Sequence, residues 1–130
     1  MLYENLIQQY INGWKQNDIA MITAPLAENC IIIESHGPTY HGIQSITRWF
    51  ELWQAANSSI LQWNIVSFSF YAETQIAFCE WDFACISNDI KYALLGISKV
   101  QFLKEKISFI HEYRMTKAPY VWRGDRLESE

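Results

Sequence analysis

The stretch ILQWNIVSFSFYAETQIAFCEWDFACISNDIKYALLGISKVQFLKEKISFIHEYRM, residues 60–115, decides the fold of this chain. It divides into four long segments rich in β-branched and aromatic residues, which is the composition of strands. The short polar breaks AET, SND and KEK separate these segments and suit hairpin connections. The stretch therefore predicts four consecutive antiparallel strands, over 60–71, 74–87, 89–103 and 106–115.

The residues before this stretch predict three helices and one further strand. Apolar residues recur every three or four positions over 2–16, which places them on one face of a helix. Asp18 offers the N-cap of a second, shorter helix that ends near Pro25. The run CIIIE predicts a buried strand, and HGPTYHG after it predicts a turn. A third amphipathic helix follows Gly42 and ends at NSS, 57–59.

Helices followed by long antiparallel strands indicate an α+β fold. We expect a curved antiparallel sheet wrapped around three N-terminal helices, which makes a cone-shaped barrel with an apolar interior and an open end. Because the chain shows no repeat or linker, we expect a single domain over residues 1–115 and a C-terminal tail over 116–130. The apolar segment Tyr120-Val121-Trp122 would dock this tail on the barrel or on a second subunit.

Composition narrows the classes of function. Half of the 130 residues are apolar and 15% are aromatic, which is ample for a core. The formal net charge of −4 argues against nucleic-acid binding. No apolar run approaches the roughly 20 residues of a membrane helix, and the N-terminus lacks the pattern of a signal peptide. We therefore expect a cytoplasmic protein that binds neither nucleic acid nor membrane.

Metal binding is not expected either. The three cysteines, Cys30, Cys79 and Cys85, form no CxxC motif and have no neighbouring histidine cluster. We interpret them as reduced, buried thiols. No pattern typical of a nucleotide, zinc-protease or hydrolase site occurs, so we predict no cofactor.

The order and spacing of several short motifs carry a resemblance. They are Tyr10, Trp14, the ND at 17–18, the LAE at 26–28, Gly42, and VQFLKEKISFIHEYR near the end. In these features the chain resembles the nuclear-transport-factor-2-like superfamily, and within it the SnoaL-like proteins and the ketosteroid isomerases. The resemblance implies a cone that binds a small apolar molecule, and a homodimer formed through the outer face of the sheet.

The resemblance to ketosteroid isomerases is closest over residues 10–37, which align with that family without a gap. It implies that Tyr10 is a catalytic hydrogen-bond donor and that Glu34 replaces the aspartate that acts as general base. A carboxylate in an apolar pocket can move a proton at carbon, and a phenol can donate to the developing enolate oxygen. The second oxyanion donor of the family aligns with Ser98, which we expect to contact the substrate.

Several alternatives stay open for these residues. Glu34 is either a solvated residue at a strand end or a pocket base, and Tyr10 is either a core tyrosine or a ligand donor. His36 follows Glu34 by two residues and is either an exposed turn histidine or part of its proton network. Tryptophans at helix and strand positions either line a flat apolar pocket or fill the cone; Trp14, Trp49 and Trp81 are the expected substrate contacts.

Two further acids invite a catalytic interpretation. Glu80 and Asp82 lie two residues apart on one predicted strand, so their carboxylates share a face. The opposite phase of that strand is unbroken apolar, however, and is the better candidate for the interior. We therefore expect both acids to face outward, where Lys99 or Arg114 on neighbouring strands would pair with them.

The strand over 60–71 shows a mixed face by simple alternation. Gln62 and Asn64 fall in phase with Phe68 and Phe70, which predicts a face that is polar at one end and apolar at the other. Such a face would suit a dimer interface.

Three functions are compatible with these patterns. The first is a cofactor-independent isomerase, cyclase or dehydratase acting on a small apolar molecule. The second is a non-catalytic binder of a small ligand in the same cone, and the third is a dimerisation module whose cone is packed shut. The fold alone does not choose among them, because it hosts many chemistries.

Overall fold

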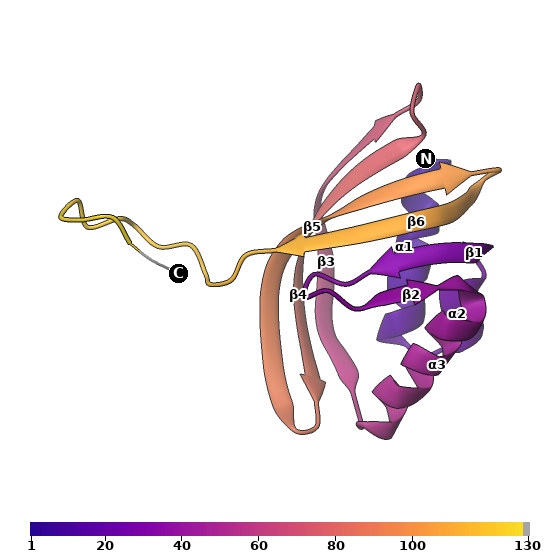
Figure 1. Cartoon of the computed structure of the whole chain (residues 1–130), viewed down its shortest axis with the longest axis horizontal. Helices are drawn as coiled ribbons and strands as arrows, with labels where there is room; N and C mark the ends of the chain where they lie inside the picture. The colour runs from indigo at the N-terminus through magenta and orange to yellow at the C-terminus, as the bar shows by residue number, and fades with distance from the viewer. Residues whose placement is uncertain (129–130) are drawn as a thin grey trace.

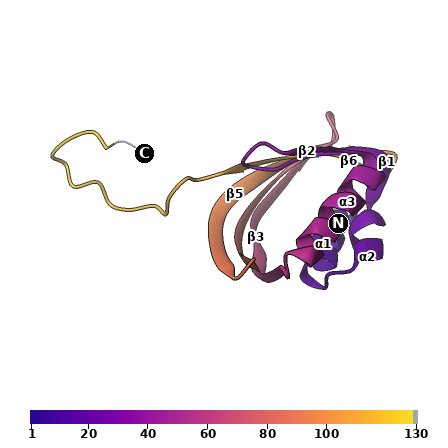
Figure 2. The same ribbon diagram turned by 60° about the horizontal axis from the view of Figure 1, so that its bottom comes forward.

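The computed structural model describes residues 1–128 and shows an α+β fold, in which three helices pack against the inner face of one curved sheet (Figures 1 and 2). The helices are α1 Leu2–Lys15, α2 Ile19–Thr23 and α3 Gly42–Ala55. The strands are β1 Leu26–Ile33, β2 Thr39–His41, β3 Ser59–Tyr71, β4 Ile76–Ser87, β5 Ile90–Leu103 and β6 Lys106–Arg114. The expected fold class and its four C-terminal strands are confirmed.

The sheet has the strand order β2-β1-β6-β5-β4-β3 and stays open, with β2 and β3 at its edges. Neighbouring strands are antiparallel except β1 and β6, which run parallel with Ile32 opposite Ile110. Two details differ from the sequence-based expectation. The sheet contains this one parallel pair, and residues 39–41 form a short strand on β1 where only a turn was predicted. Three residues are too few for a strand pattern to show.

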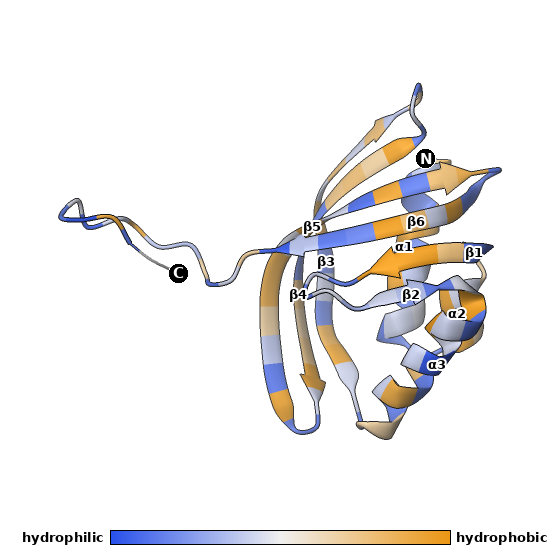
Figure 3. Cartoon of the chain, viewed as in Figure 1, coloured by the Kyte–Doolittle hydropathy of each residue, from blue (hydrophilic) through white to orange (hydrophobic). Residues whose placement is uncertain are grey.

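The predicted helix boundaries agree with local chemistry. Asp18 caps α2, since its Oδ1 accepts a hydrogen bond of 3.2 Å from the Met21 amide. Gly42 opens α3 with a φ of +82°, a left-handed conformation that favours glycine. The apolar faces of the helices and the run of isoleucines in β1, orange in Figure 3, meet in the core around Ile11, Ile32 and Ile46, which are almost completely buried.

The predicted mixed face of β3 is wrong, because the strand is bulged. Its register against β4 shifts at Val66, and the extra residue reverses the side-chain alternation. Gln62 and Asn64 donate hydrogen bonds to a β4 carboxylate on the outer face, whereas Phe68 and Phe70 pack against the core. The two pairs therefore lie on opposite faces of the sheet.

The segment after β6 leaves the domain and carries no helix or strand over its described residues (Figure 1). Tyr120, Val121 and Trp122 are exposed, and the Trp122 indole donates to the Arg126 carbonyl within the same segment. The structure thus does not show the expected docking of this segment on the barrel. Across residues 1–128, none of the helices is long and apolar enough to cross a membrane.

Candidate functional site

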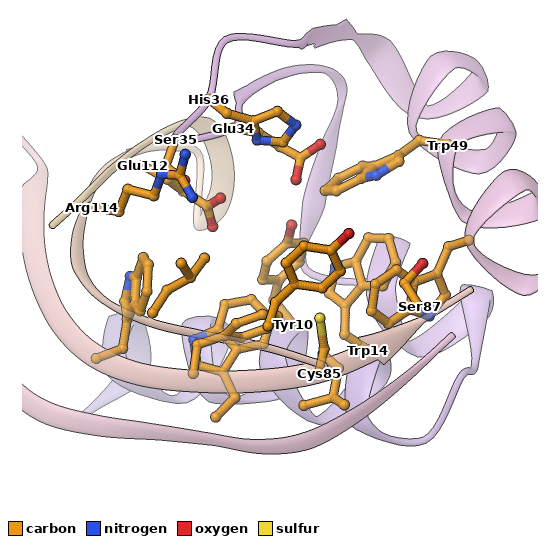
Figure 4. A pocket seen from close by; sticks show the side chains of 17 residues that line it. Tyr10, Trp14, Glu34, Ser35, His36, Trp49, Cys85, Ser87, Glu112 and Arg114 are labelled. Carbon is orange, nitrogen blue, oxygen red and sulfur yellow. The ribbon is translucent and has the colours of Figure 1, made fainter. Parts of the chain in front are cut away.

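A cavity of about 490 Å³ lies between the helices and the inner face of the sheet (Figure 4). That volume is within the range of small-molecule sites. Its wall is rich in aromatic side chains, which are Tyr10, Trp14, Trp49, Trp53, Trp63, Trp81, Phe83 and Tyr92. Titratable side chains interrupt this wall, namely Glu34, His36, Cys85, Glu112 and Arg114. The tryptophans therefore do not fill the cone completely.

Glu34 reaches the cavity through the short β1–β2 hairpin. Its amide donates to the Pro38 carbonyl at 2.9 Å, and its carbonyl accepts from the Gly37 amide at 2.9 Å. This tight turn brings the chain back beside Glu34, so that the Tyr40 hydroxyl donates to Glu34 Oε1 at 2.6 Å. Burial raises the pKa of the Glu34 carboxyl, while the Tyr40 hydrogen bond and the charge of His36 lower that pKa and offset part of the rise.

Tyr10 lies on the inner side of α1 and is 3% exposed. Its ring meets Trp14 and Trp63 edge to face, with ring centroids 6.4 Å and 6.1 Å away. Burial raises the pKa of the Tyr10 phenol, and the negative charges of Glu112 and, more weakly, Glu34 raise that pKa further. The phenol therefore stays protonated in the cavity that it shares with both carboxyl groups.

Sequence reasoning missed Glu112, which lines the same cavity from β6. Burial, followed by the charge of Glu34, raises the pKa of the Glu112 carboxyl to about 8. The residue is partly buried, and its carboxylate points into the cavity in Figure 4. Because a neutral carboxylic acid is an O–H donor, Glu112 has the protonation state at neutral pH that a hydrogen-bond donor or general acid needs.

A second bulge explains why Glu112 was missed. Simple alternation from Ile107 would put Phe109 and His111 on the inner face of the strand and Glu112 on the outer face. In the structure the register between β5 and β6 shifts between Gln101 and Phe102, so Ile107 and Ile110 are both buried although they are three residues apart. The inner face after this shift continues through Glu112. A glutamate two residues after a buried isoleucine was the only signal available.

The remaining expected substrate contacts divide into two groups. Trp14, His36, Trp49 and Trp81 line the cavity, as Tyr10 and Glu34 do. Ser98 is not among the residues that line it, and its hydroxyl accepts a hydrogen bond of 2.8 Å from the Trp81 indole. Ser98 instead borders a much smaller hollow that also touches Tyr10 and Glu112, and its contact with a substrate stays a prediction.

Glu80 and Asp82 lie outside the cavity, as expected from the alternation of β4. Their partners differ from the expected cations. Ser67 donates to Glu80 at 3.0 Å, and Asp82 accepts from the Gln62 and Asn64 amides. Arg114, one of the expected partners, lines the cavity instead.

Cys30, Cys79 and Cys85 are buried free thiols, and burial raises the pKa of Cys30 to about 12. Over the described part of the chain, the structure brings together no group of three His, Cys, Asp or Glu residues that could hold a metal ion.

Comparison with known proteins gives relatives by structure alone. No family model and no curated protein matches the chain. An LEH-like epoxide hydrolase from M. tuberculosis has a TM-score of 0.74 at 11% identity, covering 85% of this chain and 80% of its own. An NTF2-like protein of unknown function from Cytophaga hutchinsonii has a TM-score of 0.64 at 12% identity, covering 86% and 88%.

A third similar structure is a protein with a ketosteroid isomerase-like fold from Catenulispora acidiphila, solved in complex with trimethylamine. Its TM-score is 0.70 at 13% identity, and the match covers 83% of each chain. At identities this low, the matches show that the folds are alike and do not show a shared activity. The chain therefore has the nuclear-transport-factor-2-like fold that the sequence motifs indicated, the fold shared by the ketosteroid isomerase-like proteins.

Proposed function

We propose that this protein is an enzyme that moves a proton at a carbon atom of a small apolar molecule without a cofactor, as an isomerase, cyclase or dehydratase does. One observation carries the proposal. The Glu34 carboxyl, the Tyr10 phenol and the Glu112 carboxyl converge on one aromatic cavity. The epoxide hydrolase among the similar structures supports it at the level of the fold, since this fold accommodates enzymes.

Glu34 is the general base of the proposed reaction. Tyr40 occupies its Oε1, and no hydrogen bond to Oε2 is present within residues 1–128. The raised pKa of Glu34 brings its basicity closer to neutral pH, where a base is most effective. Glu34 takes a proton from a carbon next to a carbonyl group, and the electron pair of the broken C–H bond moves to the carbonyl oxygen to form an enolate.

Tyr10 and Glu112 stabilise that enolate by donating hydrogen bonds to its oxygen. Glu112 takes the place that the sequence comparison had assigned to Ser98. The protonated Glu34 then returns the proton to a different carbon, which completes an isomerisation. In a cyclisation the enolate carbon instead attacks a second carbonyl carbon, the π electrons of that carbonyl move to its oxygen, and the protonated Glu34 gives this oxygen its proton. In a dehydration the enolate electrons form a C=C double bond as the β C–O bond breaks, and the leaving hydroxide takes a proton from Glu112 to depart as water. Proton exchange with solvent then returns Glu34 to its anionic form and Glu112 to its neutral form.

The aromatic wall provides the apolar surroundings that such chemistry needs. Trp14, Trp49 and Trp81 present flat surfaces suited to a cyclic molecule, and they exclude water from the charged intermediate. Low polarity strengthens the hydrogen bonds of Tyr10 and Glu112 to a developing negative charge.

The direct experiment measures proton exchange at carbon. The purified protein is incubated in D₂O with apolar cyclic ketones such as β-tetralone and indanone, and deuterium uptake next to the carbonyl is followed by NMR. Wild type should accelerate the exchange, and Glu34→Gln should lower the rate by about 100-fold or more. Glu80→Gln is the matched control, because it removes an acid from the outer face and should leave the rate unchanged.

A different result would change the functional assignment. If wild type binds these ketones yet never accelerates exchange, or if Glu34→Gln exchanges them as fast as wild type, the catalytic proposal is wrong. Binding without exchange would favour the alternative function, a non-catalytic carrier or sensor of a small apolar ligand.

We also propose that the protein forms a homodimer through the outer face of the sheet. Phe78, Leu95, Ile97 and Tyr113 are 38–49% exposed on that face. Ile97 lies directly opposite Tyr113 in the register of β5 and β6, so these side chains are neighbours. Adjacent exposed apolar side chains of this size are typical of an interface between protein subunits.

A further inference from the structure

Arg114 is a charged cavity residue that the proposed reaction does not use. It is the last residue of β6 and follows Glu112 by two positions, so both side chains leave the strand on its inner face. Arg114 is exposed to solvent, whereas Tyr10, another residue of the cavity wall, is only 3% exposed. Arg114 therefore lies toward the solvent side of the cavity.

The Arg114 guanidinium has no hydrogen bond or ion pair to another described residue, although it shares the cavity with two acids. In particular, no ion pair joins it to Glu112. Burial and the charge of Glu34 together raise the pKa of Glu112, and no arginine lowers it. The guanidinium is thus available to a ligand.

We propose that Arg114 binds a carboxylate group of the ligand, so that the site takes an apolar carboxylic acid. The proposal deepens the proposed function and rests on it for the position of the reacting carbon beside Glu34. A guanidinium presents parallel N–H groups whose fork matches the two oxygens of a carboxylate. The Ser35 hydroxyl, which lines the cavity near Arg114 in Figure 4, supplies a further donor.

The charges in the cavity favour a carboxylate over a phosphate. Arg114 is the single arginine or lysine in the cavity wall formed by residues 1–128, and it shares that wall with Glu34 and Glu112. A phosphate dianion would have only the Arg114 guanidinium as a permanent cation and would be repelled by an ionised carboxyl group in the same wall. A monoanion is matched by one guanidinium, and a neutral Glu112 adds a donor without adding negative charge.

The arrangement also orients the ligand. In Figure 4, Arg114, Ser35 and Glu112 lie at one end of the cavity, Trp49 and Ser87 lie at the other, and Glu34 lies between them. A carboxylate held at the first end directs the apolar body of the ligand toward Trp49. The carbon between the two ends then lies beside Glu34.

The test compares three ligands of one shape by isothermal titration calorimetry at neutral pH and low salt. They are β-naphthoate, the neutral β-naphthamide, and the cationic β-naphthylmethylamine. Naphthoate should bind wild type about tenfold more tightly than naphthamide, the size of effect expected for one charge-assisted contact. Arg114→Gln should remove that preference, and Arg114→Lys should keep part of it.

Lys91→Gln is the matched control, because it removes one positive charge from the same sheet. Lys91 is exposed and precedes the cavity residue Tyr92, so its side chain lies on the opposite face of β5. This variant should keep the preference for naphthoate. Circular dichroism of each variant checks that the fold is intact.

Several results would overturn the carboxylate proposal. They are equal binding of naphthoate and naphthamide, tightest binding of the amine, no naphthoate binding at millimolar concentration, or an unchanged preference in Arg114→Gln. These outcomes are separable from failure of the proposed catalysis. Glu34→Gln should still prefer naphthoate, and a lack of deuterium exchange in wild type would leave that preference as it is.

Discussion

The Tyr40 hydroxyl donates a hydrogen bond of 2.6 Å to Oε1 of Glu34, and this contact orients the carboxyl group in the cavity. The Tyr40 ring is itself fixed, since it stacks on Trp49 with an interplanar angle of 5° and centroids 4.2 Å apart. The hairpin therefore connects the candidate base to α3 through one tyrosine. Tyr40 is a positioning residue, because it acts on the reaction through Glu34.

The first prediction concerns Tyr40→Phe. The variant keeps the stack on Trp49 but removes a hydrogen bond that lowers the pKa of Glu34, so that pKa should rise further. The rising limb of the pH–rate profile for deuterium exchange should therefore move to higher pH. Tyr71→Phe, which alters an exposed tyrosine elsewhere in the sheet, should leave the profile where it is. An unmoved limb in Tyr40→Phe would show that this contact does not tune the base.

The second prediction concerns the dependence of stability on pH. The folded-state pKa of Glu112 is about 8, above the ordinary value of 4.5. Between these two values the folded protein holds a proton that the unfolded chain has released, so the free energy of unfolding falls as pH rises. Glu112→Gln removes this contribution. The free energy of unfolding of the variant should fall less than that of wild type as the pH rises from 4.5 to about 8. Near pH 8 the variant should be the more stable protein.

Urea denaturation at several pH values across that window measures this effect. Glu80→Gln, which removes an exposed acid, should follow wild type. Parallel curves for wild type and Glu112→Gln would contradict the assignment of a raised pKa to Glu112.

The third prediction concerns Gly96, which lies under Trp81. A methyl group at this position would overlap the Trp81 ring and the Tyr113 carbonyl oxygen. Gly96→Ala should therefore lower the free energy of unfolding by about 1–3 kcal/mol and push Trp81 toward the cavity. Denaturation and ligand affinity should both report the change.

Adding Trp81→Phe to Gly96→Ala separates the effect of the overlap with the Trp81 ring from that of the overlap with the Tyr113 carbonyl oxygen. The smaller ring lacks the indole atoms that the new methyl group would meet, so the double variant should recover part of the lost stability beyond simple additivity. Strict additivity of the two changes would mean that the overlap with Trp81 does not cause the loss.

The sequence predicted the elements of this fold well because their signals are local. The helical stripe over 2–16, the Asp18 cap and the four long strands each follow from spacing and composition within a short window. The resemblance over residues 10–37 singled out Tyr10 and Glu34, and both line the cavity. It succeeded because the first helix and the first strand of this fold have a fixed geometry relative to each other.

The errors arose where a single residue changes the phase of a strand. The bulge at Val66 separates Asn64 from Phe68, and the shift near Phe102 turns Glu112 inward. Period-two reasoning cannot detect an extra residue, since the residues on either side still alternate correctly. The hydrogen bond between the Trp81 indole and Ser98 was missed for another reason, because no local pattern shows which polar group a buried indole meets on the next strand.

The last prediction concerns the proposed homodimer. Ile97→Lys places a charge among exposed apolar side chains on the outer face, where burial against a second subunit would be costly. The monomer should tolerate it, because Glu80 lies directly opposite on β4 and can pair with the new lysine. Light scattering after size exclusion should show a dimer for wild type and a dissociation constant at least about tenfold weaker for the variant. Leu52→Lys, which changes a 53% exposed leucine on α3, should leave the dimer intact. A monomeric wild type, or a variant that dimerises as well as wild type, would exclude this face as the interface.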